Sequence, residues 1–153
     1  GKIFAFEIDG FGSRLLIDDA NAPNLLSLPY LGFVKANDRI YQNTRRFVLS
    51  QDNPYFRRGR YAAAIGSPHT GKTNVWHLST IMQALTSADE NEIGNCLATL
   101  KRTHAGTGFM HESYDPDDPK KFTRSWFAWA NTIFGELVLK IYDERRSLLS
   151  REF

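Results

Sequence analysis

A long helical pattern over residues 123–149 limits the possible folds of this chain more than any other feature of its sequence. Apolar side chains recur there every three or four residues and so share one wide face of a helix. Shorter patterns of the same kind cover residues 38–50, 75–86 and 89–103. We therefore predict a mainly α protein of antiparallel helices that bury these faces in a common core. On the long helix, the residues expected in the core are Trp126, Phe127, Ala130, Ile133, Phe134, Leu137, Val138 and Ile141.

Shorter elements are predicted before the first of these helices. Apolar and polar residues alternate over residues 3–9, which favours a short strand, and a second apolar run covers residues 15–17. We therefore expect a short β-hairpin-like segment near the N-terminus. Pro23 suits the first turn of a short helix over residues 23–28, which Pro29 must end.

Polar residues mark the starts of two later helices. Asn37 or Asp38 can cap the helix at 38–50, because either side chain can accept hydrogen bonds from the first backbone N–H groups. The sequence Ser87-Ala-Asp-Glu90 has the spacing of a capping box and predicts that the next helix begins there.

Two connections between helices, at 51–74 and 104–122, are long and rich in Pro, Gly and polar residues. A long connection without secondary structure inside a compact domain is usually functional. One helical pair separates the two connections, and consecutive antiparallel helices place alternate connections at the same end of a bundle. We therefore expect His69 to lie near His111 and Glu112.

The composition excludes several classes of protein. The 19 basic and 17 acidic residues give a net charge of +2, and the basic residues do not form the stripe typical of nucleic-acid binding. The single cysteine, Cys96, cannot form an internal disulfide and is expected to fill space in the core. No run of about 18 apolar residues is present, so we predict no membrane-spanning helix.

The segment Gly66–Thr73 fits the Walker A pattern of nucleotide-binding proteins. Nucleotide binding is the weaker alternative here, because the acidic run at 15–19 precedes the glycine loop and no parallel βαβ series follows it. Pro68 also lacks one of the backbone N–H groups that a phosphate cradle needs. The histidines do not have the spacing of a zinc site, and we predict no metal and no other cofactor.

Acidic and aromatic side chains gather within residues 109–131. His111 and Glu112 lie between a glycine-rich turn and a polar loop, and Trp126 and Trp129 follow. Aromatic rings stack on sugar faces, while carboxylates move protons or bind hydroxyl groups, so this combination favours a carbohydrate site. The alternative for Glu112 is a solvated surface loop, and the alternative for the whole chain is a non-catalytic helical sugar-binding module.

Several segments, spread in order along nearly the whole chain, carry a resemblance to a known family. They are Phe6–Gly12, Ile17–Gly32, Leu49-Ser50 with Asn53–Tyr55, Ile65–His69, Met110–Ser113 and Phe122–Asn131. In these segments the chain resembles glycoside hydrolase family 125, the metal-independent exo-α-1,6-mannosidases. Together they are far more specific than the glycine loop alone.

The resemblance implies an (α/α)6 barrel, in which six inner and six outer helices surround a site at one mouth. Residues 1–153 would be the C-terminal part of a single catalytic domain of this kind. An inner helix face without its partner helices remains exposed, so self-association through the half-barrel face is also expected.

The resemblance also implies a reaction: removal of terminal mannose, with inversion, from α-1,6-linked mannosides derived from N-glycans or mannan. An inverting glycosidase uses one carboxylic acid to protonate the leaving oxygen and one carboxylate to activate water. By similarity, Glu112 is the general base. The general acid is expected before Gly1, so the 153-residue chain alone should be inactive.

The resemblance further suggests which residues hold the sugar. Asn21, Ser67 and His69 match positions expected in the subsite for the terminal mannose. Asp19 and His111 are predicted to be their neighbours in the same site.

Overall fold

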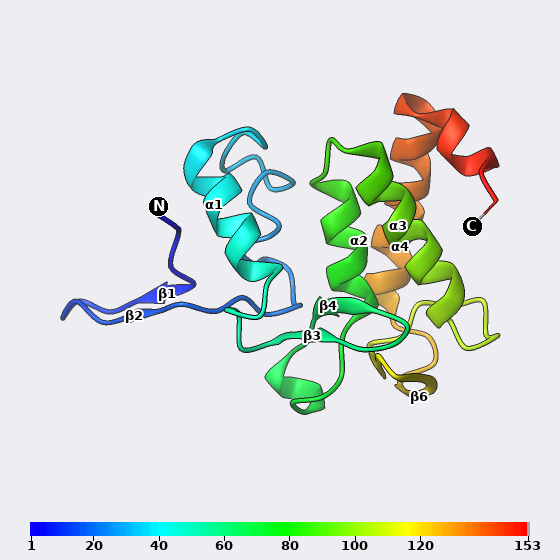
Figure 1. The fold of residues 1–153 in the computed structure, drawn as a ribbon, viewed down its shortest axis with the longest axis horizontal. Coiled ribbons are helices and arrows are strands. Elements are labelled where there is room, and N and C mark those ends of the chain that lie inside the picture. Colours follow the sequence, from blue (N-terminus) through cyan, green and yellow to red (C-terminus); the bar gives the residue numbers. More distant parts are fainter. Residues whose placement is uncertain (153) are drawn as a thin grey trace.

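Helix α2 packs against both α3 and α4 in the computed structural model, which describes residues 1–152 (Figure 1). The helices are α1 (Arg39–Val48), α2 (His77–Leu85), α3 (Glu90–Thr103) and α4 (Ala128–Glu144), with short 3-10 helices at Pro68–Thr70 and Arg146–Ser150. The predicted helices at 38–50, 75–86 and 89–103 are therefore confirmed, apart from a few residues at their ends. None of the helices in the described part of the chain is long and apolar enough to cross a membrane.

Antiparallel strand pairs complete the fold. The pairs are β1 (Glu7–Ile8) with β2 (Arg14–Leu15), β3 (Phe56–Arg58) with β4 (Ala63–Ile65), and β5 (Ser113–Asp115) with β6 (Asp118–Thr123). The pair β1–β2 confirms the expected N-terminal hairpin and projects away from the helices (Figure 1). The helices and strand pairs agree with part of the architecture that the resemblance implied, and residues 1–152 do not close a barrel by themselves.

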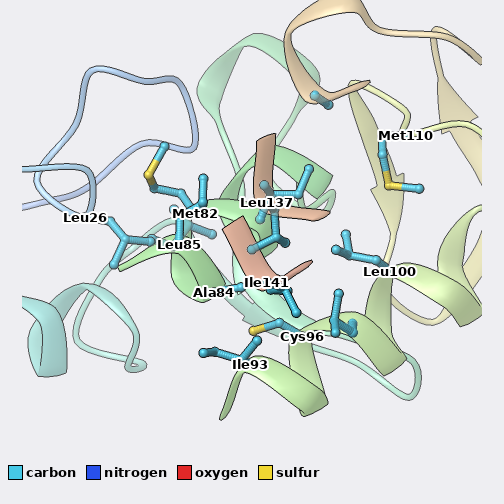
Figure 2. Close-up of a cluster of buried hydrophobic side chains, with 14 of the residues drawn as sticks. Leu26, Met82, Ala84, Leu85, Ile93, Cys96, Leu100, Met110, Leu137 and Ile141 are labelled. Atoms are coloured by element: carbon cyan, nitrogen blue, oxygen red, sulfur yellow. The ribbon is translucent and has the colours of Figure 1, made fainter. Parts of the chain in front are cut away.

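The core lies between α2, α3 and α4 (Figure 2). Met82 and Leu85 of α2, Ile93 and Leu100 of α3, and Leu137 of α4 are all buried there. Burying one such side chain contributes about 1.5–3 kcal/mol to stability, so these apolar faces are what hold the three helices together.

Cys96 occupies the same core, as predicted, and its side chain packs between the helices (Figure 2). Burial raises the pKa of its thiol to about 12. The thiol therefore remains protonated at neutral pH and is a poor nucleophile.

The predicted helix over residues 23–28 is wrong, because this segment forms a series of turns. The buried Asp18 carboxylate accepts the backbone N–H groups of Leu25 and Leu26 at 2.9 and 3.0 Å. Asn24 and Ser27 exchange further hydrogen bonds between side chain and backbone. Side chains thus satisfy the backbone groups that a helix would pair, and Asn and Ser favour this local bonding over helix.

The caps are partly as predicted. Asp38 caps α1 and accepts the N–H groups of Ile40 and Tyr41 at 2.8 and 2.9 Å. At α3 the cap is Asp89 rather than Ser87, and its carboxylate accepts a hydrogen bond from the backbone N–H of Asn91, in the first turn of the helix, at 2.8 Å. The capping-box prediction therefore located the start of α3 correctly but assigned the cap to the wrong residue.

The two long connections contain more regular structure than predicted. The connection at 51–74 includes β3 and β4, and the connection at 104–122 includes β5 and most of β6. Helix α4 consequently begins at Ala128 and not at residue 123, because Thr123 pairs with Ser113 in the β5–β6 sheet. Residues 124–127 separate β6 from α4, and Arg124, the first of them, has a positive φ of 45° that an α-helix does not contain.

Candidate active site

A cavity of about 730 Å³ lies beside the N-terminal ends of α2 and α4. Each of these helices follows one of the two long connections, so both connections lie near the cavity. This volume is within the range of about 300–1,000 Å³ typical of small-molecule sites. The lining residues are Asn21, His69, Trp76, Glu112, Arg124, Trp126, Phe127, Ala128 and Trp129. The prediction that Glu112 faces the same cavity as His69 and Asn21 is therefore confirmed, although they come from three separate segments.

Glu112 directs its carboxylate into this cavity from the residue just before β5. Its side chain is 14% exposed. The Thr123 hydroxyl donates a hydrogen bond to Oε2 at 3.0 Å, and the Arg124 Nε lies 3.4 Å from the same oxygen. Glu112 is thus a largely shielded carboxylate with fixed partners, and the alternative of a freely solvated surface side chain is wrong.

Arg124 is a cavity residue that the sequence analysis did not identify. Its guanidinium lies 5.9 Å from the centre of the Phe127 ring and forms the ion pair with Glu112. Arg124 lies within the segment Phe122–Asn131 that resembles the family, and this position could have identified it as a site residue. The helical periodicity instead assigned residue 124 to the long helix. The guanidinium can donate hydrogen bonds to the hydroxyl groups of a bound ligand.

Asn21 is held by two of the other predicted site residues. Its amide Nδ2 donates to Asp19 Oδ1 at 3.1 Å and to Ser67 Oγ at 3.3 Å. Both amide hydrogens are used in this way, so the side-chain oxygen is the group that Asn21 offers to the cavity. Asp19 and the fully buried Ser67 lie behind Asn21 and outside the cavity lining.

His111 also lies behind the cavity and not in its lining. Its ring is buried and stacks on Phe122 with the ring centres 3.9 Å apart, while Nδ1 lies 2.7 Å from the carbonyl oxygen of Ser125. Its backbone N–H donates to Nδ1 of His77 at 2.8 Å. These contacts fix the backbone next to Glu112, and the His111 ring is not among the residues that line the cavity.

Burial keeps this histidine pair neutral. It lowers the pKa of His77 to about 3, and it also lowers the pKa of His111. Because His77 accepts a hydrogen bond at Nδ1, its Nε2 carries the proton and lies 2.9 Å from the Thr103 hydroxyl. The pair is therefore a fixed hydrogen-bonded support beneath the site and not a proton donor at neutral pH.

Aromatic side chains form one wall of the cavity. Trp126 and Trp129 are 56% and 57% exposed, so the predicted place of Trp126 in the core of the long helix is wrong. Trp76 is buried, and its ring meets Phe127 edge to face with the centres 5.7 Å apart. Exposed indole faces beside a carboxylate and an amide are suited to binding sugar rings.

The glycine loop does not form a phosphate cradle. Ser67 caps a 3-10 turn at Pro68–Thr70, and α2 begins only at His77, several residues beyond the loop. A P-loop needs a helix directly after the glycine segment, so this geometry does not support nucleotide binding. Residues 1–152 also contain no cluster of three or more His, Cys, Asp or Glu side chains that could hold a metal ion.

Comparisons with known proteins identify the family of this chain. Residues 1–139 match the family described as metal-independent alpha-mannosidase, glycoside hydrolase family 125. The meiotically up-regulated gene 157 protein of Schizosaccharomyces pombe is 52% identical over 152 residues, which are 99% of this chain and 30% of that protein. The chain therefore spans about a third of that relative's length.

A solved structure gives the same result. It is a metal-independent α-mannosidase structure from Streptococcus pneumoniae, described as a non-productive substrate complex with α-1,6-mannobiose. Its TM-score with this chain is 0.90 at 47% sequence identity, and the match covers 94% of this chain and 34% of the other. On the family match and the identity of these relatives, the chain belongs to glycoside hydrolase family 125, the metal-independent α-mannosidases.

Proposed function

We propose that residues 1–153 are the C-terminal part of a single (α/α)6 catalytic domain, and that Glu112 is its general base. The observation that carries this proposal is the Glu112 carboxylate in a cavity walled by Trp126 and Trp129, in a chain of an α-mannosidase family. The length of the Streptococcus pneumoniae structure supports the domain assignment, because this chain corresponds to 34% of it.

The proposed reaction is the removal of terminal mannose, with inversion, from α-1,6-linked mannosides that derive from N-glycans or mannan. The α-1,6-mannobiose in the Streptococcus pneumoniae structure supports this choice of linkage. Glu112 takes a proton from water as the water attacks the sugar from the face opposite the leaving group. An acid about 6.5–9.5 Å away protonates the leaving oxygen.

The general acid is proposed to come from the part of the longer domain that precedes this chain. Among the cavity-lining residues that the structure describes, Glu112 is the sole carboxylate. Asn21 and His69 are proposed to bind hydroxyl groups of the terminal mannose. Asp19 and Ser67 support that subsite by holding the Asn21 amide.

The outer face of α4 fits the same proposal. Leu139 and Tyr142 are 66% and 49% exposed on this helix. In the longer domain, helices outside this chain would cover these apolar side chains, since large exposed apolar groups favour association. In the isolated chain, a second copy would cover them, which is the self-association expected from a half-barrel.

Replacing Glu112 tests the proposed role in the longer enzyme. Glu112→Gln keeps the size of the side chain but removes the base, and an inverting mechanism has no second base. We expect kcat on α-1,6-mannobiose to fall by about 10²–10⁴-fold or more. The affinity for the sugar, measured by calorimetry, should change little. NMR of the parent reaction should show β-mannose as the first product, and the 153-residue chain alone should release none.

The matched control is Glu136→Gln on α4, which removes a carboxylate outside this cavity. It should retain the parent's kcat. Near-normal turnover by Glu112→Gln would exclude Glu112 as the base, and activity of the isolated chain would place the acid within residues 1–153. Mannoside binding without any turnover by the parent enzyme would favour the sugar-binding module instead.

A further inference from the structure

A chain of three hydrogen bonds leads to Glu112 from residues that line no part of the cavity. The Asn74 Nδ2 donates to Ser113 Oγ at 3.0 Å, the Ser113 and Thr123 hydroxyls lie 2.8 Å apart, and Thr123 donates to Glu112 Oε2 at 3.0 Å. Ser113 is fully buried, and the other three residues are half-buried. The chain is therefore fully shielded from bulk water at Ser113 and partly shielded at its other members.

We propose that Thr123 is a positioning residue that keeps the Glu112 carboxylate correctly oriented by means of this hydrogen-bond chain. The proposal rests on the role of Glu112 as general base given above. It assigns to Thr123, Ser113 and Asn74 a function in the reaction, although none of the three touches the substrate.

Hydrogen-bond chemistry fixes the direction of the chain. A carboxylate accepts only, so the Thr123 proton points toward Glu112, and the Thr123 oxygen then accepts the proton of Ser113. The Ser113 oxygen in turn accepts from the Asn74 amide nitrogen, which donates only. Every donor thus points toward Glu112, and the bonds in such a chain strengthen one another.

The backbone holds the members of the chain in place. Ser113 and Thr123 are directly opposite each other in the β5–β6 sheet. Val75, next to Asn74, exchanges two backbone hydrogen bonds of 2.9 Å with Tyr114, next to Ser113. The positions of all three polar groups are therefore set by strand register, and not by flexible side chains alone.

The chain also orients the carboxylate. Within residues 1–152, the polar contacts of Glu112 with Thr123 and Arg124 both involve Oε2. Oε1 is thus left to accept the proton of the attacking water. Loss of the Thr123 contact would let the carboxylate rotate and would move Oε1 away from the position in which it accepts that proton.

The test is Thr123→Val in the longer enzyme, because valine keeps the branched shape and the strand preference of threonine but has no hydroxyl. We expect kcat on α-1,6-mannobiose to fall by about 10- to 100-fold with little change in KM, as for an interaction that matters in the transition state. Thr123→Ser restores the hydroxyl and should return kcat toward that of the parent.

Two further variants make the result specific. Thr132→Val, on an exposed position of α4 outside the cavity, should leave kcat and KM unchanged. Ser113→Ala breaks the chain one bond earlier and should reduce kcat in the same direction by a smaller factor. If Thr123→Val does not fold, Ser113→Ala alone decides, since an unchanged kcat in that variant contradicts the proposal.

Glu112→Gln, assayed in parallel, separates the two proposals. If Glu112→Gln is inactive but Thr123→Val has the parent's kcat, the positioning role is wrong and the general base stands. If Glu112→Gln is active, the proposed function itself fails. A Thr123→Val enzyme that loses stability, and whose activity Thr123→Ser does not restore, would show that Thr123 only supports the strand pair.

Discussion

Arg124 occupies the left-handed region of backbone conformation, with φ of 45°, directly after β6. A side chain with a Cβ costs about 1–2 kcal/mol in this conformation. The conformation turns the chain from β6 toward α4 and brings the guanidinium to 3.4 Å from Glu112. Residues held in such regions concentrate at functional sites, so we interpret this strain as the consequence of placing Arg124 beside the carboxylate.

Two substitutions of Arg124 separate strain from function. Both Arg124→Gly and Arg124→Ala remove the guanidinium, but only glycine adopts a positive φ without strain. We expect Arg124→Gly to be more stable than Arg124→Ala by about 1 kcal/mol in urea unfolding, while both lower mannoside turnover of the longer enzyme to the same extent. Equal stability of the two variants would show that φ at this position carries no strain.

At the scale of elements, the approach of β4 to the start of α2 depends on Gly66. A Cβ on this glycine would lie 2.2 Å from the carbonyl oxygen of Asn74, which is backbone and cannot rotate away. The Gly66 N–H donates to Tyr55 and its carbonyl oxygen accepts from Ala20, at 2.8 and 3.0 Å. Three segments thus meet at Gly66, and one of them carries the first residue of the hydrogen-bond chain to Glu112.

Gly66→Ala is therefore expected to destabilise the protein by about 1–3 kcal/mol, because the added methyl group must displace a packed backbone. The matched control is Gly135→Ala in α4, where an added Cβ meets nothing within 4 Å. Alanine should stabilise that helix by about 0.5–1 kcal/mol. Urea unfolding of the two variants checks both signs, and a Gly66→Ala variant as stable as the parent would contradict the close approach.

At the scale of the whole molecule, two buried groups act on stability in opposite directions between about pH 4 and 7. Burial lowers the pKa of His77 from 6.5 to about 3. As the pH falls below 6.5, the unfolded chain therefore binds a proton at His77 before the folded protein does, and stability decreases. Burial raises the pKa of Asp18 from 3.8 to about 7, although the N–H groups of Leu25 and Leu26 oppose this. As the pH falls below about 7, the folded protein therefore binds a proton at Asp18 before the unfolded chain does. The contribution of Asp18 to stability is fully present below pH 3.8 and is lost as the pH rises to about 7.

Variants of these two groups should shift the pH dependence in opposite senses. Relative to the parent, His77→Gln should gain stability toward acidic pH, and Asp18→Asn should lose stability toward acidic pH. We expect each difference to be on the order of 1–3 kcal/mol across this range. Urea unfolding at several pH values measures both slopes, and a shift of both variants in the same sense would show that one of the assignments is wrong.

Local patterns in the sequence predicted much of the fold. The periodicity of Leu85, Ile93 and Leu137 within their segments placed three helices and the core between them, because a helical face is a property of neighbouring residues. The patterns failed at residues 23–28 and at the start of α4. There, side chains such as Asp18 and strand partners such as Ser113 capture backbone groups, and the partner residue is distant in the sequence.

The candidate site was likewise predicted only in part. The sequence by itself determined the family, most of the helices and the convergence of Asn21, His69 and Glu112 on one site, because the order of the connections and the matched segments require no knowledge of packing. Only the tertiary structure decided that Arg124 faces the cavity while His111 does not. The physical reason is that a side chain's exposure and hydrogen-bond partners depend on which distant segments pack against it, and no local pattern records them.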